Sequence, residues 1–260
     1  MTRFLSEFTP NPVAFKIFGL DIMWYGILIA TGIMVGTLVA YKRAPVHGIE
    51  SERVLDLLLF CVPAGIIGAR LYFVAFNWGD YAWDFAKIIN TRLGGLAIHG
   101  GLIAGVLVGI IICLARETKP LSAADVFAPG VAIAQSIGRW GNYFNSEAHG
   151  GPTDLPWGIL VDGQIVHPTF LYESLWCFVM FFILVIIDNR RTFDGQTALS
   201  YGMLYSLERF FVEGLRTDSL MLFGVYKQAR LISGLIFILC LIMFIRLRKA
   251  AKSKDTIFFN

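Results

Sequence analysis

The hydrophobic positions of the chain fall into seven long segments, separated by short stretches rich in polar residues, glycine and proline. A hydrocarbon core about 30 Å thick is crossed by a helix of roughly 20 apolar residues, and each segment approaches that length. The pattern therefore predicts an all-α polytopic membrane protein with about seven transmembrane helices, the sixth being the least hydrophobic. The predicted spans cover residues 18–41, 54–76, 96–115, 122–143, 168–187, 197–215 and 229–247.

Two polar stretches between the spans have a character of their own. Residues 77–93, with Asp80 and Trp83, are typical of a short amphipathic helix, and we expect an arm lying on the outer face. Residues 147–166 combine Pro152 and Gly163 with a short apolar alternation, which predicts a small extramembrane loop or hairpin. Neither is large enough for a separate domain, so we expect residues 1–260 to form a single integral membrane domain.

Composition agrees with this class. Of the 260 residues, 56% are hydrophobic and 16% are charged, whereas soluble domains carry about 25% charged residues. A net charge of +3 is too small to indicate a nucleic-acid partner. The four cysteines each fall in a different apolar segment without metal-site spacing, so we interpret them as small core residues. No cleavable signal peptide is recognisable, and the first span is expected to be retained.

The distribution of basic residues predicts the orientation. Just over half of the 22 lysines and arginines follow spans one, three, five and seven, including the cluster from Arg246 to Lys254. Because cytoplasmic loops are enriched in Lys and Arg, we expect a cytoplasmic C-terminus and an N-terminus on the outer side.

Arg139 lies at the predicted outer end of span four, with Asn142, Asn145 and Glu147 close behind it. Polar groups at membrane depth cost several kcal/mol unless they are paired or hydrated. Arg139 could reach lipid headgroups at the interface. Alternatively, these residues form a site for an anionic substrate.

A second polar cluster lies on span six, where Tyr205, Arg209, Glu213 and Arg216 fall on one narrow stripe of a helix. The simplest structural interpretation is an Arg209–Glu213 pair that ties helices together. A stripe facing a shared cavity would instead serve binding.

Four further polar positions have separate interpretations. His99 stands between glycine pairs at the start of span three, either as an accessible functional group or as a satisfied structural one. Tyr25 usually would be a packing residue. Buried Arg70 is most simply paired with a carboxylate, and Glu173 is most simply a partner for an arginine.

Arginines facing a cavity in the outer half of a bilayer suit a lipid phosphate, which their planar donors grip by forked hydrogen bonds. No motif for a metal or a nucleotide is present. The residues alone thus indicate a protein acting on an anionic lipid, and a transporter or flippase remains the competing class.

Six motifs in this order closely resemble the bacterial phosphatidylglycerol–prolipoprotein diacylglyceryl transferase family. The resemblance covers nearly the whole chain, and the stretch at 138–150 is its most specific part. The motifs are Trp24-Tyr25-Gly26, Gly68-Ala69-Arg70, His99-Gly100-Gly101, Gly138-Arg139-Trp140-Gly141-Asn142 through Gly150, His167-Pro168 with Leu171-Tyr172-Glu173, and the stretch from Tyr205 to Arg216.

The resemblance implies a transferase of the bacterial inner (cytoplasmic) membrane, with residues 147–166 on the periplasmic side. It would move diacylglyceryl from phosphatidylglycerol to the thiol of the lipobox cysteine in a prolipoprotein signal peptide. A thioether forms and glycerol-1-phosphate leaves. The implied partners are these two substrates and membrane lipids, with no metal, cofactor or nucleic acid.

By matching motif positions, the resemblance also implies the site residues. Arg139 and Arg209 would be the essential phosphate-side arginines, and His99 a base or polar organiser. Two positions depart from the family pattern: Ala97 replaces a frequent hydroxyl residue, and Glu208 adds a carboxylate beside Arg209. The other implied substrate-binding residues are Tyr25, Asn142, Glu147, Gly150, Tyr205 and Glu213.

Overall fold

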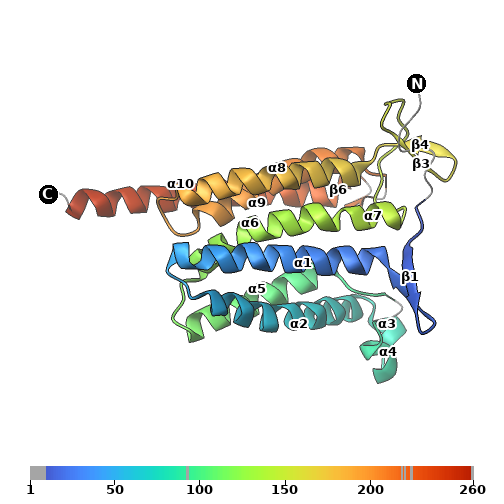
Figure 1. Cartoon of the computed structure of the whole chain (residues 1–260), viewed down its shortest axis with the longest axis horizontal. Helices are drawn as coiled ribbons and strands as arrows, with labels where there is room; N and C mark the ends of the chain where they lie inside the picture. Colours follow the sequence, from blue (N-terminus) through green and yellow to red (C-terminus); the bar gives the residue numbers. More distant parts are fainter. Residues whose placement is uncertain (1–9, 92–93, 218, 220, 223–224, 259–260) are drawn as a thin grey trace. The chain divides into compact units, whose positions relative to one another are not determined.

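The structure, a computed structural model, describes residues 10–91, 94–217, 219, 221–222 and 225–258, with side chains for all of these except 221, 222 and 254–258. Long helices dominate the chain (Figure 1). They are α1 (Trp24–Arg43), α2 (Ser51–Phe76), α5 (Ile98–Ala115), α6 (Pro120–Gly138), α8 (Thr169–Asn189), α9 (Gln196–Leu215) and α10 (Gln228–Phe258).

Shorter elements connect the long helices. Among the described residues, the short helical elements are the 3₁₀ turn η1 (Ala44–His47) and the helices α3 (Trp78–Tyr81), α4 (Phe85–Ile89) and α7 (Trp140–Phe144). The strands described form three antiparallel hairpins: β1 (Val13–Ile17) with β2 (Leu20–Met23), β3 (Ile159–Val161) with β4 (Gln164–Val166), and β5 (Met221–Leu222) with β6 (Tyr226–Lys227).

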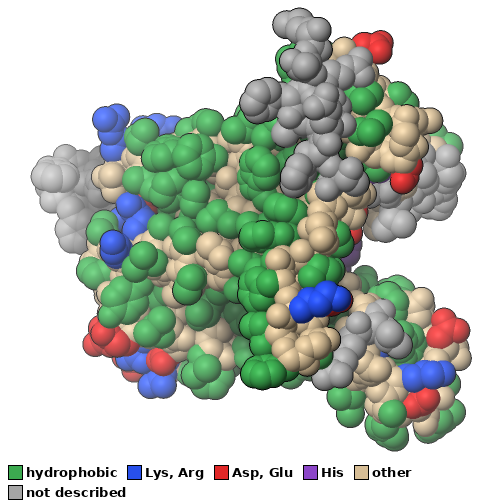
Figure 2. Space-filling model, turned by 45° about the vertical axis from the view of Figure 1, so that its right-hand side comes forward, with side chains coloured by type: hydrophobic (Ala, Val, Ile, Leu, Met, Phe, Trp, Pro, Cys, Tyr) green, Lys and Arg blue, Asp and Glu red, His purple; other side chains and the backbone are tan. Residues whose placement is uncertain are grey.

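Six of the described helices are long and apolar enough to cross a membrane, which confirms the predicted polytopic all-α class. Figure 2 shows many hydrophobic side chains on the visible surface. The long helix outside this set of six is α9, the span predicted to be least hydrophobic, because its polar residues interrupt the apolar run.

The first span begins later than predicted. Helix α1 starts at Trp24, because residues 13–23 form the β1–β2 hairpin, in which Lys16 pairs with Asp21 at 3.0 Å. The turn of this hairpin places Phe18 and Gly19 at positive φ angles of 49° and 79°, a geometry that no helix accommodates. The prediction of a helix from residue 18 is therefore wrong.

The chain divides into two compact units, Met1–Val39 with Ala124–Asn260, and Ala40–Ala123. In the first unit, a core of Ala132, Cys177, Met180 and Leu184 joins α6 to α8, and aromatic residues of α8 and α9 pack against it. Side-chain hydrogen bonds reinforce the same contacts: Trp176 donates to the carbonyl of Leu204 at 3.1 Å. Helices α6, α8 and α9 thus hold one another in a fixed register.

A buried carboxylate fixes the start of α9 in the first unit. Asp125 of α6 accepts hydrogen bonds from the backbone N–H groups of Gly195 at 2.7 Å and Ala198 at 2.8 Å. These donors belong to the first turn of α9, where unsatisfied N–H groups favour a negative charge. Asp125 therefore caps α9 from a neighbouring helix.

The second unit is built on the packing of α2 against α5. The two backbones approach closely at Gly68 and Gly100: a Cβ added to Gly68 would lie 2.6 Å from the carbonyl oxygen of Gly100. Such contacts between glycines are common where helices pack in lipid. Arg70 of α2 is buried in this unit and bonds to the backbone carbonyls of residues 87, 88, 90, 94 and 95. No carboxylate pairs with it among the described residues, so that prediction is wrong.

The two stretches singled out between the spans contain short elements. Residues 77–93 include α3 and α4, and Trp78, Trp83 and Phe85 in this stretch are exposed. Residues 147–166 include the β3–β4 hairpin. Ile159, Val161 and Val166 of this hairpin pack against Tyr143 and Phe170. Their placement on the outer face of a membrane stays a prediction.

Candidate functional site

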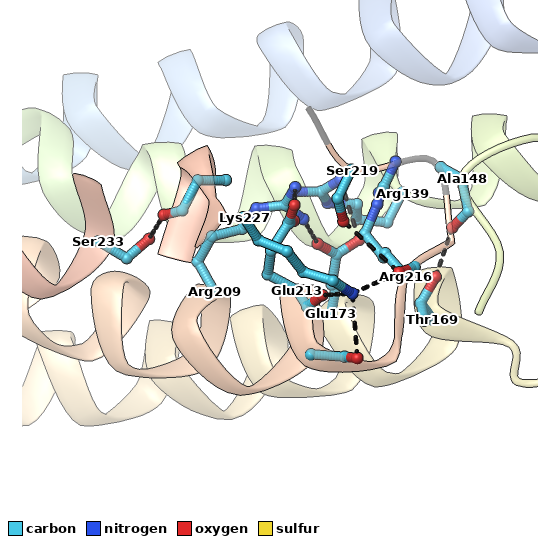
Figure 3. Close-up of polar contacts among 12 residues, drawn as sticks. Arg139, Ala148, Thr169, Glu173, Arg209, Glu213, Arg216, Ser219, Lys227 and Ser233 are labelled. Carbon is cyan, nitrogen blue, oxygen red and sulfur yellow. Dashed lines mark hydrogen bonds and ion pairs between the residues drawn. The ribbon is translucent and has the colours of Figure 1, made fainter. Parts of the chain in front are cut away.

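Two arginines and two glutamates from three helices form a continuous ion-pair cluster in the first unit (Figure 3). Arg139 Nη1 lies 2.9 Å from Glu173 Oε2, and Arg209 Nη1 lies 2.8 Å from Glu173 Oε1. Arg209 Nη2 in turn lies 2.6 Å from Glu213 Oε2. Glu173 is thus shared between both arginines, one carboxylate oxygen to each. We call these four residues the arginine–glutamate cluster.

The position of each member follows from its helix. Arg139 stands at the junction of α6 and α7, Glu173 lies in the second turn of α8, and Arg209 and Glu213 are four residues apart on α9. An (i, i+4) spacing places two side chains on the same helix face, so the α9 pair needs no further support. Glu173 reaches both arginines because α8 contacts α7 and α9.

Burial differs across the cluster. The carboxylates of Glu173 and Glu213 are 1% and 2% exposed, whereas Arg139 and Arg209 are 20% and 18% exposed. Buried charges need partners, and here two positive and two negative groups balance formally. The cluster therefore presents its cations, not its anions, to the surroundings.

The alignment of the donors is incomplete. Only the contact from Arg209 Nη1 to Glu173 Oε1 has the geometry of a hydrogen bond. Oε2 of Glu173 and Oε2 of Glu213 are close to arginine nitrogens but receive no aligned N–H group. A guanidinium carries five N–H donors. Both arginines therefore keep donors for a further ligand.

Asn142 and Glu147 form a second polar group just beyond Arg139. Asn142 Nδ2 donates to Glu147 Oε1 at 3.1 Å, Asn145 Nδ2 donates to the same oxygen at 3.3 Å, and the Glu147 N–H donates to the Asn142 carbonyl at 3.0 Å. The Glu147 side chain is exposed, so its second carboxylate oxygen is accessible. Asn142 also follows Arg139 by three residues, which places both side chains on one side of α7.

Tyr25 and Trp140 position α7 beside the cluster. The Tyr25 ring packs on Gly141, where an added Cβ would lie 3.0 Å from ring carbon Cε2. Trp140 Nε1 donates to Ser174 Oγ at 3.1 Å, next in sequence to Glu173. These contacts couple the turn that carries Arg139 to α1 and α8.

Gly150 belongs to the backbone frame of the site. Its N–H donates to the carbonyl of His167 at 2.9 Å, and it pairs with Arg216 in an isolated β-bridge. Gly151 bonds to the carbonyl of Leu215 at 2.9 Å. The loop after α7 is thereby tied to the C-terminal end of α9.

Lys227 reinforces the same end of α9, a role that sequence reasoning missed. Its Nζ donates to the carbonyls of Glu213 at 2.8 Å, Gly214 at 3.2 Å and Arg216 at 2.6 Å (Figure 3). A cation at a helix C-terminus interacts favourably with the unsatisfied carbonyls. The only sequence signal is a lysine just before α10, which is too common to be diagnostic.

Tyr205 lies one turn before Arg209 on α9 and stacks on Tyr201, with ring centroids 5.8 Å apart. Tyr201 donates to Gln135 Oε1 at 3.0 Å. Glu208 is 5% exposed, and neither of its carboxyl oxygens has a hydrogen-bond partner among the described residues. The stripe predicted on span six is therefore present, with an additional buried carboxyl beside it.

His99 belongs to the second unit, in the first turn of α5, and its side chain is exposed. The Tyr72 ring of α2 lies 6.4 Å from the imidazole, measured between centroids. All other predicted site residues lie in the first unit. Among the described residues, no group of His, Cys, Asp and Glu is arranged to hold a metal ion.

Comparison with known proteins gives a consistent result. The family profile described as prolipoprotein diacylglyceryl transferase matches residues 12–246. Three similar proteins are each named phosphatidylglycerol–prolipoprotein diacylglyceryl transferase. The protein from Clostridioides difficile is 53% identical, over 85% of this chain and 89% of its own length. The protein from Finegoldia magna is 48% identical, over 94% of this chain and 98% of its own length. The protein from Staphylococcus aureus strain JH9 is 43% identical, over 88% of this chain and 86% of its own length. The match to the family profile and the identity to these relatives both show that the chain belongs to the prolipoprotein diacylglyceryl transferase family.

Proposed function

We propose that this protein transfers the diacylglyceryl group of phosphatidylglycerol to the thiol of a prolipoprotein lipobox cysteine, forming a thioether and releasing glycerol-1-phosphate. Family membership supports the reaction, and the arginine–glutamate cluster supports the manner in which it proceeds. The single observation that carries the proposal is a pair of partly exposed arginines that share one carboxylate and keep unaligned N–H donors.

The lipid phosphate would bind to Arg139 and Arg209. A phosphodiester carries one negative charge, and a bidentate guanidinium contact to it is among the strongest hydrogen-bonding arrangements in proteins. Glu173 holds the two guanidinium groups near one another before lipid arrives. Its charge also offsets theirs, so the two partly exposed guanidinium groups are not left without a negative partner before lipid binds.

The same arginines would then stabilise the leaving group. The sulfur attacks a glyceryl carbon, the carbon–oxygen bond to phosphate breaks, and its electron pair stays on the phosphate oxygen. The phosphate monoester that departs carries more negative charge than the bound diester. Donors placed where negative charge develops lower the barrier. Arg139 and Arg209 would therefore contribute more in the transition state than in the initial complex.

The nucleophile must be a thiolate, and a free cysteine thiol has a pKa of about 8.5. We assign His99 as the group that accepts the thiol proton, since an imidazole changes charge near neutral pH and this one is exposed. The chemistry of the imidazole and the family motif support this role.

The remaining predicted residues take supporting roles. The accessible carboxylate oxygen of Glu147 and the amide of Asn142 suit the hydroxyl groups of the glycerol headgroup. Tyr25, Gly150 and Glu213 keep Arg139 and Arg209 in place, and Tyr205 lines the same stripe of α9. We further propose that the site opens to the outer side of the inner membrane, with the C-terminus in the cytoplasm.

The direct test uses purified protein, vesicles of phosphatidylglycerol labelled in the glycerol backbone of the diacylglyceryl group, and a synthetic signal peptide with a lipobox cysteine. We expect the label to appear on the peptide as a base-stable thioether and glycerol-1-phosphate to appear in equal amount. Vesicles of phosphatidylcholine and a peptide with serine in place of the cysteine are the controls. Movement of lipid between leaflets without labelled peptide would refute the proposal in favour of a transporter.

A further inference from the structure

All five N–H donors of the Arg70 guanidinium group on α2 are hydrogen-bonded to backbone carbonyls, which belong to α4, to its C-cap residue and to two glycines before α5. The side chain is 6% exposed. The five acceptors and their distances are the carbonyls of Ile88 at 2.8 Å from Nε, Gly94 at 3.0 Å and Gly95 at 2.9 Å from Nη1, and Lys87 at 2.6 Å and Asn90 at 2.8 Å from Nη2.

No ion pair competes for this guanidinium in the part of the chain that the structure describes. Its further contact is with the ring of Tyr81, whose centroid lies 5.0 Å from Cζ. An arginine has five N–H donors in a rigid planar fork, and all five are matched here by acceptors. A lysine has three donors around a single nitrogen and cannot reproduce this geometry.

The two glycines held by Arg70, Gly94 and Gly95, lie just before the start of α5, whose first turn contains His99. Gly95 has φ +80°, and a Cβ there would overlap Arg70 Nη1 and approach the Phe73 ring to 3.0 Å, so only glycine fits. Two residues later, the N–H of Ala97 donates to the carbonyl of Ala69 at 3.0 Å. Residues 69 and 70 of α2 therefore hold the chain immediately before α5.

Helix α5 cannot shift independently of these contacts. Gly100, the residue after His99, lies against Gly68 of α2 with no space for a side chain on either residue. Tyr72 lies beside the imidazole. The start of α5 is consequently fixed by one short stretch of α2, within which Arg70 contributes the largest number of hydrogen bonds.

We propose that Arg70 is a positioning residue for the transfer reaction: by holding the main chain of residues 87–90 and 94–95 against α2, it sets the position of the His99 imidazole. This inference rests on the proposed function, in which His99 accepts the thiol proton. It assigns Arg70 no contact with lipid or peptide. Its effect on catalysis therefore passes entirely through His99.

The experiment is a double-variant cycle in the full-length protein, with Arg70→Lys, His99→Ala and both together, assayed for transfer to the lipobox peptide. A displacement of about 1 Å can cost roughly 10²-fold in rate. We expect Arg70→Lys to lower kcat by about that factor with KM for both substrates nearly unchanged. The combined variant should be no slower than His99→Ala alone, because a misplaced loop has no effect once the imidazole is absent.

Amide hydrogen exchange supplies the second measurement. Arg70→Lys should accelerate exchange at residues 88–97 while α8 and α9 keep the parental pattern, which distinguishes local displacement from unfolding. The matched control is Arg53→Lys on the same helix, whose partners Glu50 and Asp56 lie at 3.5 and 3.7 Å and remain within reach of a lysine. This control should transfer at the parental rate.

Three results would overturn the inference: parental transfer by Arg70→Lys, losses that multiply in the combined variant, or parental transfer by His99→Ala. Failure of the proposed function looks different, since the parent protein itself would then not modify the peptide.

Discussion

Glu173→Gln is the substitution that most directly tests the arginine–glutamate cluster. Glu173 is 1% exposed and contacts Arg139 and Arg209 at 2.9 and 2.8 Å. Removing one partner of a buried ion pair typically costs 3–5 kcal/mol, because an uncompensated charge is left behind. Glutamine can still accept a hydrogen bond from Arg209, and the arginines are 20% and 18% exposed. We therefore expect a loss in the free energy of unfolding at the lower end of this range, about 3 kcal/mol.

The assay is thermal unfolding in nonionic detergent micelles, followed by tryptophan fluorescence. A loss of about 3 kcal/mol corresponds to a fall in Tm of about 6–12 °C for a chain of this size. The matched control is Glu50→Gln, which removes a carboxylate that is 74% exposed and 3.5 Å from Arg53. An exposed pair of this kind contributes less than about 1 kcal/mol.

Phosphatidylglycerol should restore much of the stability of Glu173→Gln. Under the proposed function, a lipid phosphate shares the arginines with Glu173 in the parent, whereas in the variant it would supply the missing negative charge. Ligand at about 100 times its Kd stabilises by about 2.7 kcal/mol. We therefore expect phosphatidylglycerol to raise the Tm of the variant more than that of the parent, and phosphatidylcholine to raise neither. A variant that melts with the parent would contradict the stabilising role of Glu173. A variant that gains no more from phosphatidylglycerol than the parent does would show that the cluster is not a phosphate site.

The remaining predictions concern the arginines, His99 and the topology. Arg139→Lys and Arg209→Lys should each lower kcat, and the alanine variants should lose roughly 10²-fold or more in the rate of single-turnover transfer. A folded Arg139→Ala protein with parental kcat would contradict this prediction. His99→Ala should lower the transfer rate by about 10²–10⁴-fold at pH 7 and recover part of that loss toward pH 9, where the peptide thiol ionises unaided. A defect that stays constant across this range would leave His99 only a positioning role. A reporter fused after Asn260 should be active only if it works in the cytoplasm, and activity of a reporter that functions only outside would reverse the proposed orientation.

The long elements were predictable because their signal is local and strong. The spans predicted at 54–76 and 96–115 correspond to α2 (Ser51–Phe76) and α5 (Ile98–Ala115). A run of apolar residues has few alternatives to a membrane helix. The start of α1 was missed because Phe18 and Leu20 extend the apolar run into a hairpin, and hydropathy does not distinguish a strand from a helix over so few residues.

The site was predictable only where spacing along one helix determines contact. The Arg209–Glu213 pair follows from an (i, i+4) spacing, and the structure confirms it. The sharing of Glu173 between two arginines depends on how α6, α8 and α9 are arranged, which the order of residues does not specify. The carboxylate predicted for Arg70 was wrong for a different reason: its acceptors are backbone carbonyls, which every residue carries and no motif reveals.

The anchoring of Arg70 to main-chain atoms has a consequence for mutational tolerance. Since carbonyl groups do not depend on residue type, substitutions at Lys87, Ile88 or Asn90 leave the acceptors unchanged, provided that the loop keeps its conformation. Gly95 has no such freedom, because any side chain there would displace the guanidinium. In a deep mutational scan, these three positions should therefore be permissive, with strict intolerance at Arg70 and at the two glycines of positive φ that it touches, Gly94 and Gly95.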